Sequence, residues 1–259
     1  MKKIFILLTI LPLIFSCSDN DNSTENNSNV DPSNVLLKRV ITRNYNTTYE
    51  TVFNYNGKKL LNQKSSRQNK VFTYDGNNIV KIEWYQNPNE ENTLLQYVVF
   101  EYYSNGNLKK FAKFIDAPVT VDFTYNTDNT IDFLYTDESN NYYNFSGKFK
   151  IENNEIKEYY FEEGNTNQNS LIYFNDNKNH PLKNVVGYDK LILYGYFFAS
   201  SHSSGFSTNF GNKHNQVSYG LLENPSSIQM LNTFEYNTNN FPININKNNQ
   251  FISDYLFYE

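Results

Sequence analysis

Three histidines are the first side chains in this 259-residue chain that could hold a metal ion or act in catalysis. His202 and His214 flank a polar stretch, and His180 lies upstream. The twelve-residue spacing of His202 and His214 matches no compact ligand motif, and the chain's one cysteine lies far away in sequence. Surface histidines in a polar loop are therefore the favoured interpretation.

A nucleophilic serine has no stronger support in the sequence than a metal-binding histidine. Ser203, Ser204 and Ser207 follow His202, but several serines near a histidine are expected in a serine-rich stretch. No serine stands in the Gly-x-Ser-x-Gly turn that exposes a nucleophile in one large class of hydrolases. We predict no catalytic serine.

Adjacent carboxylates offer acid–base chemistry only if the fold brings them together. The pairs are Glu90–Glu91, Asp137–Glu138 and Glu162–Glu163. A glycosidase needs two carboxyl groups that converge across a cleft, whereas neighbours in sequence usually mark solvated turns. Asn175–Asp176–Asn177 has oxygen ligands that suit calcium, but it lacks the glycine and distal glutamate of a calcium loop. The sequence predicts no catalytic residue, metal or cofactor.

Aromatic neighbours could stack against sugar rings. Trp84 with Tyr85, and Tyr102 with Tyr103, are the two candidates. Packing in a core or between strands explains the same residues without a ligand, and this is the interpretation that we favour.

Cys17 is the residue with the clearest chemical role. A head of two lysines precedes an apolar stretch, Ile4 to Phe15, which has the length of a signal-peptide core. It is too short to cross a bilayer, which takes roughly 20 apolar residues. Ile14-Phe15-Ser16-Cys17 resembles the bacterial lipobox, in which the cysteine thiol receives a diacylglycerol before cleavage. The resemblance implies a lipoprotein signal peptide over residues 1–16 and lipidation of Cys17.

The segment after the cysteine predicts a tether. Residues 18–29 contain no large apolar side chain, so they cannot bury surface that would offset chain entropy. We expect an acylated, disordered tether over residues 17–34 and a single domain over residues 35–259. The acidic start of the tether resembles the signal that sends Bacteroidota lipoproteins to the outer leaflet of the outer membrane. A plain solvated spacer explains it equally well.

Composition favours strands and argues against some partners. The chain has 22 tyrosines and 21 phenylalanines, and it is rich in asparagine. Aromatic residues favour strands and asparagine favours turns, although a low-GC genome would enrich the same residue types. Cleavage before Cys17 leaves 20 basic and 27 acidic residues, a net charge of −7. An acidic chain argues against nucleic acid as a partner, and a single cysteine excludes an internal disulfide.

A short unit recurs along the chain: aromatic, polar, aromatic, then an Asn/Asp/Gly turn, then an apolar residue. Side chains two residues apart share one face of a strand, and Asn, Asp and Gly tolerate the positive φ of tight hairpin turns. Each unit therefore predicts one β-hairpin. The units are Phe53–Leu60, Phe72–Ile79, Phe100–Leu108, Phe123–Ile131, Phe149–Ile156 and Phe234–Phe241.

These units resemble YD-type repeats. The whole layout is similar to a family of Bacteroidota lipoproteins of unknown function with a porin-like fold. The matching features are the lipobox, the Asn/Ser tether, the serial turns, Asn175–Leu182 and Phe234–Tyr236. The resemblance implies a porin-like fold, and it brings no established activity and no functional residues.

The sequence thus predicts an all-β domain with at most one short helix. We expect a long antiparallel meander of roughly 14–18 strands, which closes into a barrel or a strongly curved sheet to remove its edges. Leu191–Phe198 fits either a short helix or a buried strand, and Ser200–Gln216 reads as a long loop. Alternation alone does not decide whether the apolar face points to a core or to lipid.

Three functions fit these features. The first is a cell-envelope lipoprotein, anchored to the outer membrane through Cys17 on its periplasmic or cell-surface face. It would bind or scaffold a glycan or peptide without catalysis. A secreted carboxylate-dependent hydrolase and a true outer-membrane β-barrel are the alternatives. We favour the first because the tether and the repeats come without a recognisable catalytic set.

Overall fold

The computed structural model describes residues 31–86, 93–115, 117–138, 143–164, 170–198, 211–247 and 252–259. The described residues of the compact unit Asp31–Glu259 form seventeen strands and one short α-helix. The strands are β1 (Leu37–Asn44), β2 (Thr47–Asn56), β3 (Lys59–Ser65), β4 (Gln68–Asp75), β5 (Asn78–Gln86), β6 (Leu94–Tyr102), β7 (Leu108–Phe114), β8 (Pro118–Tyr125), β9 (Thr130–Asp137), β10 (Tyr143–Glu152), β11 (Glu155–Gly164), β12 (Leu171–Asn179), β13 (His214–Leu221), β14 (Asn224–Met230), β15 (Asn232–Tyr236), β16 (Pro242–Lys247) and β17 (Ile252–Tyr258).

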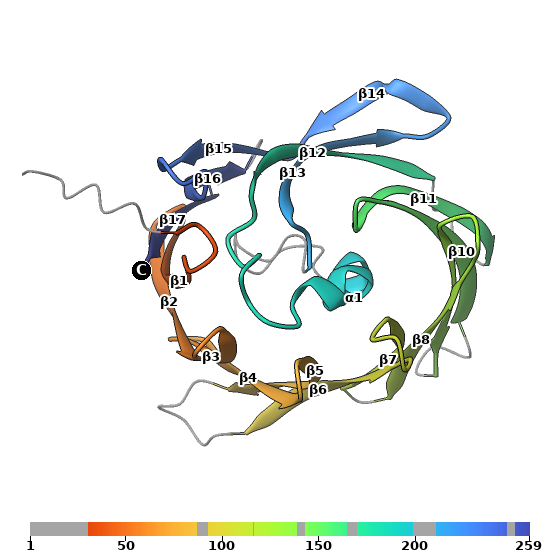
Figure 1. Cartoon of the computed structure of the whole chain (residues 1–259), viewed down its shortest axis with the longest axis horizontal. Coiled ribbons are helices and arrows are strands. Elements are labelled where there is room, and N and C mark those ends of the chain that lie inside the picture. Colours follow the sequence, from red (N-terminus) through yellow and green to blue (C-terminus); the bar gives the residue numbers. More distant parts are fainter. Residues whose placement is uncertain are drawn as a thin grey trace, which may run out of the picture. The chain divides into compact units, whose positions relative to one another are not determined.

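The strands form one antiparallel meander that curves round until its last strand pairs with its first (Figure 1). Each strand pairs with the next along the chain from β1 to β14 and from β15 to β17. β14 and β15 are separated by one residue, Leu231, which is too short for a hairpin turn. The Leu231 amide instead donates a hydrogen bond to the carbonyl of Val217 in β13 (2.9 Å). The result is a nearly closed barrel, which confirms the predicted all-β meander.

The repeated units form hairpins, as their turn chemistry predicts. Residues 57–58 and 76–77 are two-residue turns, in which Gly57 and Gly76 have φ of 57° and 54°. A residue without a Cβ adopts this left-handed conformation at no steric cost. Asn153 and Asn154 take positive φ at the β10–β11 turn, where asparagine tolerates it best among the other residue types.

Apolar side chains point into the barrel. In β8, Val121 and Phe123 are buried while Asp122 and Thr124 are exposed. The same alternation runs round the sheet, so its apolar face forms an enclosed core rather than an outer surface. Other members of this core are Phe53, Leu60, Phe72, Ile82, Val98, Phe111, Phe133 and Phe149.

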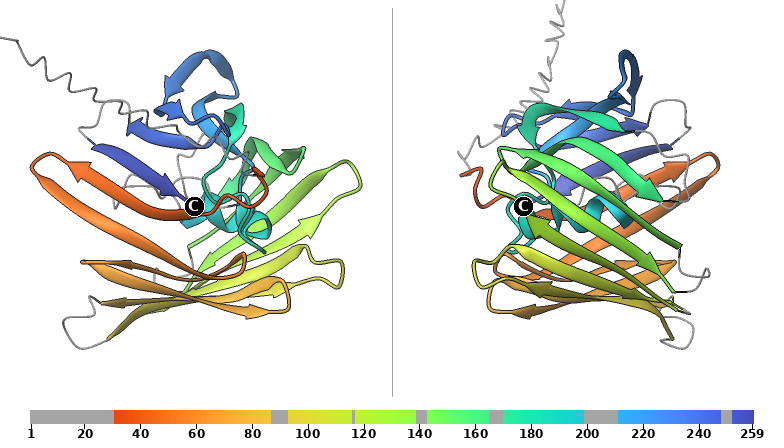
Figure 2. Two further views of the ribbon diagram at one scale, coloured as in Figure 1. Left: turned by 60° about the vertical axis from the view of Figure 1, so that its left-hand side comes forward. Right: turned by 90° about the vertical axis from the view of Figure 1, so that its right-hand side faces the viewer.

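Residues 180–198, which follow β12, enter the barrel and fill part of it (Figures 1 and 2). We call residues 180–198 the plug. It ends in a 3₁₀ turn, η1 (Asp189–Leu191), followed by the helix α1 (Ile192–Phe198). The Tyr194 ring packs edge-on against Phe100 and Phe111. Seven residues do not make a stable helix alone, so aromatic packing holds α1, and the helix alternative predicted for this stretch is confirmed.

None of the helices in the described part of the chain is long and apolar enough to span a membrane.

Candidate functional site

A cavity of about 190 Å³ lies where the plug meets the turns of the barrel wall. We call it the plug cavity. Asp189, Lys190, Ile192 and Leu193 line it from the plug, and three hairpins line it from the wall. The wall residues are Asn105–Leu108, Tyr125, Ile131, Ile151 and Asn154.

Hydrogen bonds hold the polar rim of the plug cavity. Lys190 Nζ donates to Asn78 Oδ1 (2.6 Å), which ties the plug to β5. The Asn107 amide donates to Asn105 Oδ1 (3.0 Å), which fixes the β6–β7 turn. Gly106 in this turn has φ of 84°, and a Cβ there would lie 3.0 Å from Lys190 Nζ. Glycine therefore lets the turn and the lysine approach each other.

The lining of the plug cavity combines apolar side chains with polar groups that donate and accept hydrogen bonds. The Asp189 carboxylate accepts, the Lys190 ammonium donates, and the asparagine amides do both. The volume equals roughly six water molecules and is smaller than a typical drug-sized pocket. Opposite charges on the rim balance each other. The arrangement suits a small uncharged group with several hydroxyls or amides, such as one sugar ring.

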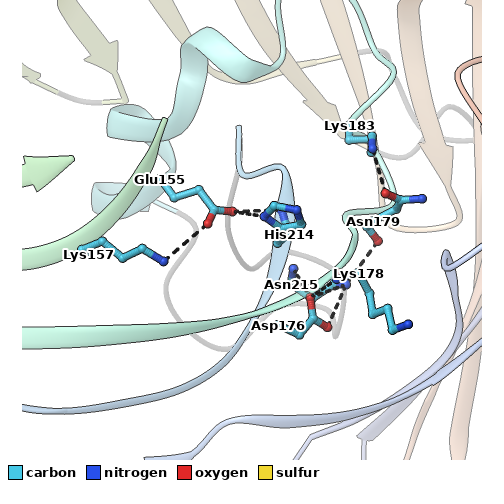
Figure 3. A network of polar contacts seen from close by, with 8 residues as sticks. All are labelled: Glu155, Lys157, Asp176, Lys178, Asn179, Lys183, His214 and Asn215. Atoms are coloured by element: carbon cyan, nitrogen blue, oxygen red, sulfur yellow. Dashed lines mark hydrogen bonds and ion pairs between the residues drawn. The ribbon is translucent and has the colours of Figure 1, made fainter. Parts of the chain in front are cut away.

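A second polar cluster holds the ends of β12 and β13, where the register between these strands is interrupted (Figure 3). Asp176 accepts hydrogen bonds from the backbone amides of Lys178 (2.9 Å) and Asn215 (3.1 Å). It also accepts one from the Tyr236 hydroxyl. These donors hold together strands that the interrupted ladder does not, so Asp176 acts as a structural acceptor. Across the described ranges, no group of three or more His, Cys, Asp or Glu side chains is placed to hold a metal ion.

The cluster also contains a histidine–carboxylate pair (Figure 3). Glu155 is 3% exposed at the start of β11. Its Oε1 accepts a hydrogen bond from the backbone amide of His214 (3.0 Å) and lies 3.1 Å from His214 Nδ1. The β11–β12 register covers only two residue pairs, so the Glu155–His214 contact helps to hold β13 to β11 where the wall is weakly paired.

The structure corrects the interpretation of His214 as a residue of the polar loop. His214 begins β13, so the strand starts inside the stretch that was expected to be a loop. His180 is buried at the start of the plug, and its Nδ1 accepts a hydrogen bond from the Leu182 amide (3.2 Å). The partner of His214, Glu155, lies 59 residues away along the chain, so local polarity does not reveal this contact. His202 lies outside the described residues.

The aromatic neighbours serve packing, as expected. Trp84 is 6% exposed and belongs to the core. The Tyr102 hydroxyl donates to the carbonyl of Ile79 (2.6 Å), and that of Tyr103 donates to the carbonyl of Phe123 (2.9 Å). Their rings are thus tied to the wall rather than presented together as a stacking platform.

Among the described side chains, no two of these adjacent carboxylates form a facing pair. Glu162 is on the outer wall and pairs with Lys148 (3.4 Å). Asp137 shares the inward face of the sheet with its partner Val119, whereas Glu138 is exposed. The other carboxylates of these pairs, the three serines and the lipidation site lie outside the described side chains; they are Glu90, Glu91, Glu163, Ser203, Ser204, Ser207 and Cys17.

The outer wall carries ion pairs, most of them between neighbouring strands. Lys110 in β7 lies 3.5 Å from Asp122 in β8. Lys148 in β10 lies 3.5 Å from Asp132 in β9, and the charges of Asp132 and Glu162 raise the pKa of Lys148. Further pairs on this face are Arg39–Glu50, Lys81–Glu83 and Lys150–Glu158.

Sequence reasoning missed two features. Asp189 and Lys190 meet the β6–β7 turn through the plug, and nothing in their local sequence indicates this contact. Lys70 carries a weak signal, because it stands two residues before the core residue Phe72 and must share its inward face. A lysine at an inward position of an alternating strand could have been singled out.

Together these features define a class of protein: a plugged, nearly closed antiparallel β-barrel with an apolar interior and a charged exterior. No family model matches the chain, and no curated protein matches its sequence. A porin-like protein from Bacteroides vulgatus ATCC 8482 is similar in structure over 87% of this chain and 99% of that chain. Its TM-score is 0.51 and its sequence identity is 15%. At this identity the likeness concerns the fold, and it supports the porin-like fold that the sequence resemblance implied.

A porin-like protein from Bacteroides uniformis ATCC 8492 also aligns with the chain. It covers 86% of this chain and 96% of its own, with a TM-score of 0.48 and 9% identity.

Proposed function

We propose that this chain is a lipid-anchored protein of the cell envelope whose barrel stands in water and binds or scaffolds a ligand without catalysis. The observation that carries the proposal is the charged outer wall. Ion pairs occupy outward positions from β1 to β11, in the body of the strands rather than only at the turns.

The energetics of lipid contact favour this function over a true outer-membrane barrel. A barrel in a membrane presents an apolar band roughly 25 Å tall to the lipid, and a lysine or arginine at mid-depth costs about 2–4 kcal/mol. The wall described here would bring several such residues into lipid. In water the same residues cost little and keep the barrel apart from other barrels.

A lipid on Cys17 would then attach the protein to the membrane. A diacylglycerol on this residue supplies two acyl chains, and stable anchoring takes at least two. The acidic start of the tether supports the outer membrane as the location, with the barrel on its periplasmic or cell-surface side. A porin-like fold is compatible with this arrangement, because fold alone does not determine function.

The plug cavity is the proposed place of ligand contact, with a glycan or peptide as the ligand. Its charge-balanced rim and small volume suit a single sugar ring or a short polar side chain. For the hydrolase alternative, Glu155 and Asp254 are the buried carboxylates of the described residues. Glu155 meets His214, and Asp254 accepts a hydrogen bond from Thr42 (2.5 Å). These contacts give each carboxylate a structural role, so we favour binding.

The test is a glycan and peptide array probed with residues 31–259 in detergent-free buffer. We expect the barrel to stay dispersed and to bind a defined glycan or peptide. Asp189→Ala should weaken that binding about tenfold, because one hydrogen bond to a charged group is lost. Asp122→Ala, which removes a carboxylate from the outer wall, is the matched control and should leave binding unchanged. A barrel that requires detergent would favour the outer-membrane alternative, and silence across the array would contradict the binding function.

A further inference from the structure

The hairpin turns of the barrel alternate between its two ends, and the plug lies at one of them. Because successive strands are antiparallel, the turns after β2, β4, β6, β8 and β10 lie at the same end as the plug. We call this the plug end. Asn184 in the plug donates hydrogen bonds to the carbonyls of Pro32 (2.7 Å) and Val35 (2.9 Å). The segment that leads back from Asp31 to Cys17 therefore leaves the barrel at the plug end.

Lysines gather at the plug end, on the plug itself and on segments bonded to it. The Val186 amide of the plug donates to the carbonyl of Lys58 (3.0 Å), and the His180 amide donates to the carbonyl of Lys213 (2.8 Å). Both of these lysine side chains are exposed. We call the whole group the lysine face; its members are Lys58, Lys59, Lys178, Lys183, Lys190 and Lys213.

The ammonium groups of the lysine face meet neutral oxygens. Lys59 Nζ donates to the carbonyl of Gly76 (2.6 Å), and Lys183 Nζ donates to Asn179 Oδ1 (2.7 Å; Figure 3). A neutral oxygen holds an ammonium group in place without cancelling its charge, whereas the outer-wall lysine Lys110 lies beside a carboxylate. The other contacts of this kind are Lys178–Asn240 (2.7 Å) and Lys190–Asn78 (2.6 Å).

Carboxylates offset only part of this positive charge. Asp31, Asp75 and Asp189 are the carboxylates next to the lysine face. Hydrogen bonds from Ser33 lower the pKa of Asp31, and the charge of Lys58 lowers it further. The remaining carboxylates of the plug end already bind cations or hydrogen-bond donors; they are Asp128, Glu152, Glu155, Asp176 and Glu259.

The opposite end of the barrel carries charge of the other sign. By sequence, the segments that join strands at that end contain one arginine, Arg67. The same segments contain five carboxylates, which are Glu90, Glu91, Asp116, Glu138 and Glu223. The barrel is acidic as a whole, but its charge is separated between the two ends, and the plug end is the more positive one.

We propose that the plug end lies against the surface of an anionic lipid membrane, with the lysine face toward the phosphate headgroups. A lysine near such a surface strengthens binding roughly fivefold, and the attraction fades within about 8–10 Å, so it acts on one end of the barrel only. The acidic end then points away from the membrane, and the plug cavity lies next to the headgroups. The orientation of the anchored chain rests on the proposed lipid at Cys17, whereas the attraction of the lysine face does not.

Flotation with vesicles tests the attraction without the lipid anchor. Residues 31–259, which hold the whole compact unit, are mixed with vesicles of phosphatidylcholine or of phosphatidylcholine with phosphatidylglycerol. We expect the barrel to float only with the vesicles that contain phosphatidylglycerol, and to dissociate as the salt concentration rises, because salt screens exposed charges. Binding to neither kind of vesicle, or equal binding to both, would overturn the proposal.

Two double variants of equal net charge show which end makes the contact. Lys58→Gln with Lys183→Gln removes two exposed lysines from the lysine face and should weaken binding about five- to thirtyfold. Lys64→Gln with Arg67→Gln removes two exposed cations near the opposite end and should leave binding unchanged. Equal losses in the two double variants would mean that net charge, and not the lysine face, controls binding, and would reject the proposal.

A second assay measures orientation in the full chain. Ser66→Cys and Asn77→Cys place a thiol in the turns at the two ends of β4, and each carries a fluorophore in the lipid-anchored protein on vesicles. With a nitroxide quencher on the headgroups, we expect stronger quenching at residue 77 than at residue 66 when phosphatidylglycerol is present. Equal quenching of the two probes would contradict the proposed orientation. A chain that fails to attach to phosphatidylcholine vesicles would contradict the anchor at Cys17 instead, and flotation would still test the lysine face.

Discussion

At the residue scale, the hydrogen bonds of tyrosine hydroxyls explain why the second aromatic position of three repeated units is a tyrosine. In three successive units the second aromatic residue reaches the apolar residue that follows the preceding turn. The Tyr102 hydroxyl donates to the carbonyl of Ile79, and the Tyr125 hydroxyl donates to that of Leu108 (3.0 Å). The Tyr74 hydroxyl accepts a hydrogen bond from the Leu60 backbone amide (3.0 Å). Burial of this hydroxyl raises the pKa of Tyr74 to about 12. Tyrosine, unlike phenylalanine, both fills the core and ties one hairpin to the next.

Lys70 leads to a prediction on stability and pH. Burial lowers its pKa to about 8 in the folded chain, against about 10.4 in an unfolded chain. Between these pH values the unfolded chain binds more protons, so the contribution of Lys70 to the free energy of unfolding rises with pH. Below pH 8 Lys70 is charged in both the folded and the unfolded chain, so the cost of burying its charge lowers the free energy of unfolding by its full amount. Lys70→Met should therefore stabilise the barrel at pH 7, by on the order of 2 kcal/mol, and by much less at pH 10.

Urea unfolding at pH 7 and pH 10 measures this difference. Lys64→Met serves as the control, because its exposed side chain on the outer face should make it nearly neutral at both pH values. A Lys70→Met protein that is no more stable than the parent at pH 7 would show that the amine is well solvated.

At the scale of the element, the helix α1 of the plug is stabilised by side-chain packing rather than by its own backbone. α1 lacks both acidic residues in its first turn and basic residues in its last turn. The Phe197 ring lies 5.2 Å from Phe133, 5.8 Å from Phe111 and 6.0 Å from Phe149. These rings come from the wall strands β7, β9 and β10. A helix that is weak by itself is thus held by aromatic side chains of the barrel that surrounds it.

Phe197→Ala should lower the free energy of unfolding by about 2–4 kcal/mol, because it leaves a cavity among these rings. Phe257→Ala is the matched control: this ring is 40% exposed on the outer wall, where it meets Arg39. Its loss should cost about 1 kcal/mol or less. Chemical unfolding of both variants measures the difference, and equal losses would mean that α1 does not depend on the wall for its position.

At the scale of the whole molecule, the direction of the side chains, and not the closure of the sheet, distinguishes a wall that faces water from one that faces lipid. The backbone ends of the barrel are joined, since Leu36 and Glu259 exchange two backbone hydrogen bonds (2.9 and 3.0 Å). Such a nearly closed wall could in principle face lipid or water. The ion pairs on its outside favour water, and for that reason the proposed function assigns membrane attachment to the lipid on Cys17.

Cys17→Ser in the full chain tests this assignment. We expect the variant to lose lipid labelling, to remain uncleaved after Ser16, and to be extractable from membranes without detergent once the signal segment is removed by protease. Metabolic labelling with a fatty acid and fractionation of cell envelopes measure these effects. Ser18→Ala is the control and should behave as the parent. A Cys17→Ser barrel that stays in the membrane after removal of the signal segment would show that the wall itself is embedded.

The local hairpins could be predicted from the sequence alone. Turn residues such as Gly57 and Gly76 act on the backbone within four residues, and strand alternation repeats every two residues, so both can be read without the fold. They predicted the hairpins, the antiparallel meander and the approximate number of strands. For the candidate sites, the same reasoning identified the packing role of Trp84 but not the plug cavity.

The direction of the apolar face became clear only in the folded barrel, because an alternating strand has the same sequence pattern whether its apolar side meets a core or lipid. It also decided that Ile192–Phe198 is a helix, since the rings that hold it come from strands much earlier in the chain. Lys190 and Asn78 become neighbours only when the plug packs inside the barrel. This contact joins residues that lie far apart along the chain, and no short stretch of sequence contains it.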